Sequence, residues 1–257
     1  PAGGQPLTRI EPISDNTSGI MGNHLSGSDG LIPARTRISA DGRYVAFESY
    51  AGTLICNDTD FSFRDIFLRD RRTGRTSVIS IARDGGEADR NAFDPVISAD
   101  GRYVAYTSDA NNLVPGTGNG FDQIFRHDRE TGTTVRISVS TTGELGDSFS
   151  YGEVINADGR YVAFYSPATN LVPDDRNGTV DVFVRDVVAG TTERVSITSE
   201  GQEGCCCGGR DPSISADGRY VAFLSQDRLD PAHANPQHLG RHRPPGLPLP
   251  GERPAGL

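Results

Sequence analysis

The long polar segment between residues 170 and 181 holds the side chains best suited to bind a metal ion. Asp175, Asn177 and Asp181 lie at positions i, i+2 and i+6 around the turn at Gly178. Calcium takes several oxygen ligands from a compact loop of this kind. No glutamate stands at the distance that an EF-hand loop requires, which favours an ordinary polar turn. Two interpretations follow, a polar turn and a calcium site, and no other cofactor is predicted.

Two further segments carry oxygen-rich side chains at similar places in the chain. Their oxygen donors are Asn57, Asp58, Asp60 and Asp65 in the first segment, and Asn119 and Asp122 in the second. The second segment, 116–122, is rich in glycine and has lost most of the carboxylates. The oxygen-rich character is therefore strongest in the first and third of these loops.

The four cysteines are Cys56 and the adjacent trio Cys205, Cys206 and Cys207. Adjacent cysteines do not bond to each other easily, because a disulfide needs suitably placed Cα atoms and side-chain vectors. Zinc and iron–sulfur sites need spaced pairs such as Cys-x-x-Cys, and the sequence has none. We interpret the trio as an incidental glycine-flanked loop, with a redox-sensitive or cross-linked loop as the alternative.

The tripeptide Gly146-Asp147-Ser148 invites a search for a catalytic triad. The nearby histidine, His127, stands where the corresponding strands have Arg69 and Arg185, so its place is a structural one. Walker, Rossmann and zinc-protease motifs are absent from the sequence. We predict no catalytic residues and no enzymatic activity for this chain.

These residues belong to an internal repeat. The string Ala-Asp-Gly-Arg-Tyr-Val-Ala starts at Ala40, Ala99, Ala157 and Ala216, at intervals of 58 or 59 residues. A second string recurs between the copies, as Asp65-Ile-Phe-Leu-Arg-Asp, Gln123-Ile-Phe-Arg-His-Asp and Asp181-Val-Phe-Val-Arg-Asp. A repeat of this length indicates that each unit is one supersecondary motif stacked on its neighbours.

Each unit is predicted to contain four short strands and no helix. Residues 95–98 and 102–108 flank an Asp100-Gly101 turn, and Asp-Gly between apolar strands is a strong hairpin signal. Residues 123–127 and 134–139 supply the third and fourth strands. The aspartates of the Asp-Gly turns, like those before the Thr-Gly turns, are interpreted as caps of their own turns. Apolar side chains point to both faces of the second strand, which favours stacked propeller blades over a sheet with one wet face.

The same strings resemble a known family. Ser-Ala-Asp-Gly-Arg-Tyr-Val-Ala-Phe, followed by Asp-Val-Phe-Val-Arg-Asp and a Thr-Gly turn, resembles the TolB-type β-propeller repeat of bacteria, over roughly Leu7 to Ser225. This chain has alanine where that family usually has proline in the Ser-Pro-Asp-Gly turn, and its units are longer. The resemblance implies an all-β propeller of four-stranded antiparallel blades and a periplasmic or extracellular setting.

The repeat also predicts where the blades lie. The propeller segment is expected over 1–225, with blades at 35–81, 94–140 and 152–198, a half blade at 211–225 and an outer strand at Leu7–Ser14. Propellers have 4–8 blades, so the chain is short for six or seven units of this length. Together with Pro1 as first residue, this favours a fragment or processed part of a larger propeller, with a closed four-bladed ring as the alternative.

The composition changes after Ser225. Residues 226–257 contain no Val, Ile, Thr, Phe or Tyr, but hold 7 of the 16 prolines and 3 of the 5 histidines. We therefore expect this segment to be disordered, or to be an out-of-frame reading of a lost half blade, and to supply no third strand. Its histidines, His233, His238 and His242, are interpreted as solvated residues.

Charge and resemblance together set the predicted function. The 257 residues carry a net charge of −9, all 25 basic residues are arginine, and no run is apolar enough to span a membrane. The chain is therefore a poor candidate for binding nucleic acid or anionic lipid, and no nucleic acid is predicted as a partner. The predicted function is a non-catalytic scaffold of an exported bacterial protein, which presents loops to a protein or a surface ligand. The alternative is the propeller part of a prolyl-oligopeptidase-like hydrolase whose catalytic domain lies outside this chain.

Overall fold

The computed structural model describes residues 11–21, 36–54, 63–116, 118–198, 201–203 and 209–225, and the backbone of 237–240. These residues form strands and turns with no helix. Cys56, Cys205, Cys206 and Cys207, as well as Asn57, Asp58 and Asp60, lie outside the described residues. So do His233 and His242, and the side chain of His238.

The strands form four antiparallel sheets in chain order. The first contains β1 (Arg37–Ile38), β2 (Tyr44–Ser49), β3 (Asp65–Asp70) and β4 (Arg75–Val78). The second contains β5 (Ala92–Ile97), β6 (Tyr103–Ser108), β7 (Gln123–Asp128) and β8 (Thr133–Arg136). The third contains β9 (Tyr151–Ile155), β10 (Tyr161–Ser166), β11 (Asp181–Asp186) and β12 (Thr191–Arg194). The fourth contains β13 (Gly209–Ile214), β14 (Val221–Ser225) and β15 (Gln237–Gly240).

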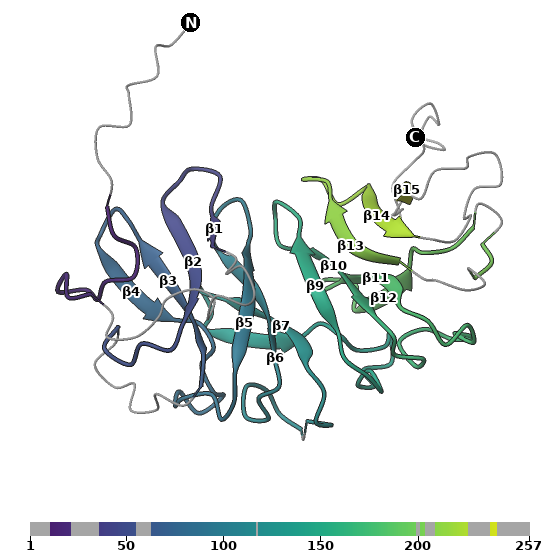
Figure 1. The fold of residues 1–257 in the computed structure, drawn as a ribbon, viewed down its shortest axis with the longest axis horizontal. Coiled ribbons are helices and arrows are strands. Elements are labelled where there is room, and N and C mark those ends of the chain that lie inside the picture. The colour runs from purple at the N-terminus through teal and green to yellow at the C-terminus, as the bar shows by residue number, and fades with distance from the viewer. Residues whose placement is uncertain are drawn as a thin grey trace, which may run out of the picture.

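The sheets are blades of a β-propeller, which follow one another along an open arc (Figure 1). Within each sheet, strands that follow one another in the chain pair with each other, as a meander requires. The all-β prediction with four-stranded antiparallel blades is confirmed. The sheets do not close on themselves, so the four-bladed ring is not the arrangement observed. The first strands of the last three blades begin at Ala92, Tyr151 and Gly209, one or two residues earlier than the repeat suggested.

The fourth sheet departs from the sequence prediction in its third strand. Residues 226–257 were expected to supply none, but β15 pairs with β14 from Val221↔Gly240 to Leu224↔Gln237. Strand pairing uses backbone amide and carbonyl groups, so an open strand edge accepts a segment with few β-branched residues. The expectation that no third strand comes from this segment is therefore wrong for Gln237–Gly240.

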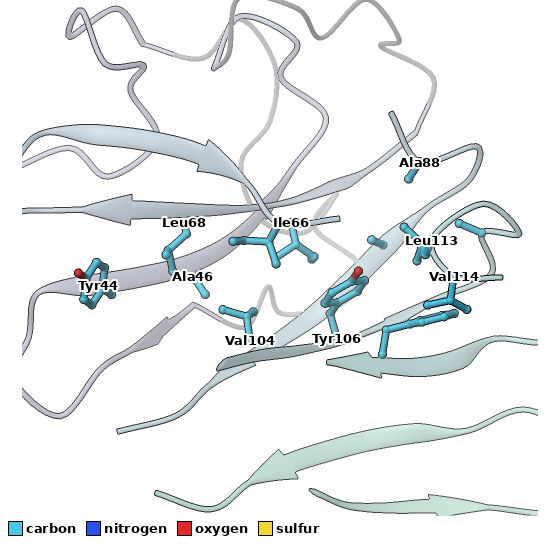
Figure 2. Packing of buried hydrophobic residues seen from close by; sticks show 13 residues of the cluster. Tyr44, Ala46, Ile66, Leu68, Ala88, Val104, Tyr106, Leu113 and Val114 are labelled. Atoms are coloured by element: carbon cyan, nitrogen blue, oxygen red, sulfur yellow. The ribbon is translucent and has the colours of Figure 1, made fainter. Parts of the chain in front are cut away.

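Neighbouring sheets pack face to face. Figure 2 shows Tyr44, Ala46, Ile66 and Leu68 of the first sheet beside Val104 and Tyr106 of the second, with Ala88, Leu113 and Val114 from the connecting loops. On the opposite face of β2, Phe47 packs on Phe67 in a separate cluster, with ring centroids 5.8 Å apart. Both faces of the sheet are thus buried, as the alternation of small and bulky residues in β2 predicted.

The strand connections alternate between two ends of each sheet. We call the end with the Asp-Gly and Thr-Gly turns the turn end, and the opposite end, with the loops 82–91, 109–122, 140–150 and 167–180, the loop end. At the turn end Asp41 accepts hydrogen bonds from the Ser39 hydroxyl at 2.6 Å and the Arg43 amide at 3.0 Å. Asp100 and Asp217 accept the same pair of bonds in their blades. The interpretation of these aspartates as caps of their own turns is confirmed.

Candidate functional site

The first strands of the last three blades, β5, β9 and β13, are the inner strands of those blades, and each begins at the loop end with a β-bulge. Pairing with the second strand shifts register at residues 93–96, 151–154 and 210–213. The bulges contain Asp94, Gly152 and Asp211, with φ of 54°, 65° and 53°. A left-handed backbone is uncommon for aspartate, and bulges of this kind change the direction of a strand and of its side chains. The bulges therefore set how the loop-end side chains of the second and third blades meet.

Four aromatic residues form a row at the loop end, which runs from the loops of the second blade onto β9 and β10 of the third. Phe121 meets Phe149 edge to face with ring centroids 4.8 Å apart, and Phe149 stacks on Tyr151 at 5.9 Å. Tyr165 of β10 continues the row at 6.2 Å from Tyr151. Phe149 is 38% exposed, and the other three are partly exposed. We call these four residues the aromatic surface.

The backbone and one carboxyl group hold the aromatic surface in place. A Cβ atom at Gly152 would lie 2.2 Å from Cε1 of Tyr165, so only glycine lets that ring lie against β9. The Tyr151 hydroxyl donates a 2.8 Å hydrogen bond to Asp122. Burial raises the pKa of Asp122, and the hydrogen bond from Tyr151 partly opposes that rise. The rings are therefore presented on a fixed frame.

The corresponding positions of the other blades hold polar side chains. Glu48 occupies in β2 the place that Tyr165 has in β10; its carboxylate pairs with Arg64 at 3.1 Å and accepts the Asp94 amide at 2.9 Å. Burial raises the pKa of Glu48. Thr107, at the same place in β6, donates to Glu153 at 2.9 Å. The first two inter-blade contacts are thus made by buried polar groups, where the third blade has an aromatic ring.

The residues predicted to bind calcium lie together at the loop end of the third blade, around an arginine. The Arg194 guanidinium is 3.1 Å from Asp175, 3.5 Å from Asp181 and 2.8 Å from Glu203. Asn177 donates to Asp181 at 2.9 Å and accepts the Thr179 amide, which is a turn interaction. Burial raises the pKa of Asp175 to about 6, and Arg194 opposes the rise.

A cation therefore already stands among the predicted calcium ligands. Asp175, Asp181 and Arg194 have side chains that are 3%, 1% and 9% exposed, so the guanidinium and both carboxylates are buried together. Within the described residues, no group of three or more His, Cys, Asp or Glu side chains is arranged to hold a metal ion. The calcium site at Asp175, Asn177 and Asp181 stays a prediction, and the ion would have to displace Arg194.

The remaining candidates have structural contacts. His127 Nδ1 lies 3.0 Å from the Thr134 hydroxyl, and Arg185 donates to Thr192 at 3.0 Å in the same place of the next blade. Asp147 accepts the amide and the hydroxyl of Thr169, across the loop end.

In the oxygen-rich segments, Asp65 accepts the Ser80 hydroxyl at 2.6 Å, Asn119 donates to the Gly146 carbonyl at 2.6 Å, and Asp122 carries the Tyr151 bond. Their oxygen atoms are used within the fold.

Sequence reasoning missed the aromatic surface. The signal was available as a departure from the repeat, because Phe149 stands where the preceding unit has Asn91, and Tyr165 where it has Thr107. The residues that the units share are concentrated at the turn end, so a search for shared residues misses positions at which one unit differs from the others.

The fold defines the class of this chain as a β-propeller with antiparallel blades. No protein-family model and no curated protein sequence matches it. Among solved structures it is similar to TolB from Acinetobacter baumannii, at 18% identity over 88% of this chain and 44% of that one, with a TM-score of 0.46. A putative TolB from Agrobacterium tumefaciens matches at 17% identity over 83% of this chain and 69% of that one, with a TM-score of 0.49.

The propeller domain of the Trilobed protease from Pyrococcus furiosus matches at 15% identity over 79% of this chain and 59% of that one, with a TM-score of 0.45. The chain thus spans less than half the length of the Acinetobacter TolB chain. At these identities the likeness is one of fold alone, that of a β-propeller similar to the TolB structures. No helix in the described residues is long and apolar enough to cross a membrane.

Proposed function

We propose that this chain is a non-catalytic scaffold that binds a protein partner through the aromatic surface Phe121, Phe149, Tyr151 and Tyr165. The observation that supports the proposal is a row of partly exposed rings, held on bulged strands at the loop end. Exposed Phe and Tyr on a rigid frame are the residues that dominate protein–protein contacts, because they bury a large area at a small cost in side-chain entropy.

The charge of the chain suggests the chemistry of the partner. A net charge of −9 favours a basic or neutral protein surface and disfavours nucleic acid and anionic lipid. Asp147 is exposed in the same loop, two residues before Phe149, where an arginine or lysine of the partner would meet it. We therefore propose an aromatic anchor site with an acidic rim.

The setting of this scaffold is also a proposal. Resemblance to the TolB-type repeat supports an exported bacterial protein in the periplasm or outside the cell. The alternative function, a propeller companion of a prolyl-oligopeptidase-like hydrolase, has no specific support among the described side chains.

Selection from a randomised peptide library tests the aromatic anchor. Peptides selected on the wild-type chain should be rich in arginine, lysine and apolar residues. Their affinity should fall about tenfold or more on Phe149→Ala, a loss of about 1.4 kcal/mol or more of binding free energy.

Val188→Ala is the matched control, because Val188 is 75% exposed on a turn of the opposite end. Its variant should bind the selected peptides as the wild type does. Equal binding to Phe149→Ala and to the wild type would show that the anchor lies elsewhere.

A further inference from the structure

The three interfaces between successive blades repeat one contact at the turn end. The glycine of each Asp-Gly turn lies on the tyrosine ring of the blade before it. A Cβ added to that glycine would come within 2.2–2.4 Å of the ring in each of the pairs Tyr44–Gly101, Tyr103–Gly159 and Tyr161–Gly218. All three glycines have a positive φ, so both the backbone and the space require glycine.

Backbone hydrogen bonds link the same turns from blade to blade. The amide of Ala40 donates to the Ala99 carbonyl, Ala99 to Ala157, and Ala157 to Ala216, at 2.9–3.0 Å. The isoleucine of each inner strand also reaches the preceding blade. Ile97 packs on the cluster of Tyr44, and Ile214 on the cluster of Tyr161. One blade therefore offers a tyrosine, and the next offers an isoleucine and an Asp-Gly turn.

The two end blades each show one half of this contact to solvent. On the fourth sheet, Tyr220 is 38% exposed and Leu224 is 41% exposed, whereas Tyr44 and Tyr161 are 8% and 3% exposed. On the first sheet Ile38 is 57% exposed. Among the described residues, Gly42 has only Arg71 and Ile38 within 4 Å of the position of a Cβ atom, and no ring.

The segment 11–21 does not cover Ile38 and Gly42 of the first blade. Thr76 donates to the Asp15 carbonyl at 2.6 Å, as Thr192 of the third blade donates to Val139 at 2.5 Å. Residues 15 and 21 form the same isolated bridge as residues 139 and 145. The segment thus occupies the place of a preceding blade's outer loop on β4, and does not cover Ile38.

We propose that the fourth sheet of one copy docks on the first sheet of a second copy, so that Tyr220 lies on Gly42 and Leu224 and Tyr220 cover Ile38. The contact is head to tail, because the two surfaces are different and complementary. A second copy fits because it carries the tyrosine half and the Asp-Gly half in the spacing that the three internal interfaces use. Two copies bring together eight sheets, within the 4–8 blades at which propellers close.

Light scattering over a range of protein concentrations tests the docking. The wild-type chain should have twice the mass of a single copy. Tyr220→Asp and Ile38→Asp should each be single copies with an unchanged strand content by circular dichroism, because both residues are exposed at the ends of the arc. Val188 is exposed on the third blade, away from both end sheets, so the Val188→Asp variant should remain a dimer.

A mixing experiment separates head-to-tail docking from the other arrangements. Tyr220→Asp and Ile38→Asp, each a single copy alone, should associate when mixed, because each retains the half that the other has lost. If the Ile38→Asp variant alone is still a dimer, two fourth sheets pair with each other and the proposal is wrong. A wild-type chain that is a single copy at all concentrations, or large aggregates that neither variant disperses, would equally overturn it.

Discussion

The two ends of the sheets follow different rules. At the turn end the blades make the same contacts, with Arg43 on Asp70 at 2.8 Å, Arg102 on Asp128 at 2.7 Å and Arg160 on Asp186 at 2.7 Å. At the loop end some contacts also repeat, such as Ser80 with Asp65 and Ser196 with Asp181, but other side chains differ from blade to blade. The first has a Glu48–Arg64 pair, and the third has the Arg194 cluster.

This difference suggests that the turn end holds the blades together and that the loop end binds a partner. Also at the turn end, the repeated tyrosine–glycine contacts and backbone hydrogen bonds place each blade on the next in one geometry, and a substitution there would disturb the interface to which it belongs. Loops that differ from blade to blade can acquire side chains for a partner, since the repeated turn-end contacts between blades do not involve them. The aromatic surface lies at the variable end, which is why we place recognition there.

The Arg194 cluster is the loop-end feature on which stability depends most. Arg194→Ala would leave two buried carboxylates without their cation, which costs about 3–5 kcal/mol and lowers the melting temperature by roughly 10 °C. Removing the guanidinium also opens the predicted calcium site at Asp175, Asn177 and Asp181. Millimolar calcium should then restore part of the melting temperature of the variant, by RT ln(1 + [L]/Kd), and should affect the wild type less.

The control for this experiment is magnesium, which demands a smaller octahedral site and should restore less. If calcium does not change the melting temperature of the Arg194→Ala variant, the segment is a polar turn and not a calcium site.

The repeated turn is expected to be the next most sensitive feature. Gly159→Ala places a Cβ 2.2 Å from the Tyr103 ring at φ +73°, whereas Gly132→Ala, at φ +69°, meets nothing within 4 Å. Both variants bear the backbone strain of about 1 kcal/mol, and only the first bears overpacking of a further 1–3 kcal/mol. Denaturant unfolding should therefore separate the two free energies of unfolding. Equal losses would mean that the tyrosine moves aside at no cost.

The sequence predicted the turn end well and the loop end poorly, for a physical reason. Asp-Gly turns, strand periodicity and the caps at Asp41 and Asp100 depend on residues adjacent in the chain, and the repeat displays them four times. The cluster of Arg194 with Asp175 joins a residue of β12 to a residue of the loop 167–180, and its arginine appears in no metal motif. The strand at Gln237–Gly240 was also missed, because its pairing comes from the edge of β14 and not from its own side chains.

Acid should weaken the turn end in a defined window. The hydrogen bond from Arg43 lowers the pKa of Asp70 to about 2, below its value in the unfolded chain. A lowered native pKa stabilises the fold above pH 4, and this stabilisation is lost as the pH falls toward 2. Asp70→Asn should remove about 1 kcal/mol at pH 7 and make the loss between pH 4 and pH 2 smaller than in the wild type. Parallel acid titrations of the two proteins would disprove a contribution from this pair.

The smallest expected effect is at the aromatic surface itself, where Tyr151→Phe removes only the hydroxyl that donates to Asp122. The loss of one hydrogen bond to a partly buried carboxyl costs about 0.5–1.5 kcal/mol at neutral pH. Burial already raises the pKa of Asp122, and the Tyr151 bond opposes the rise, so the variant should raise that pKa further. A raised native pKa makes stability fall as the pH increases from the unfolded value through the native one, so the variant should lose less at pH 4 than at pH 7. Thermal melts at the two pH values check the sign, and an equal loss at both would mean that Asp122 keeps its charge without the hydroxyl.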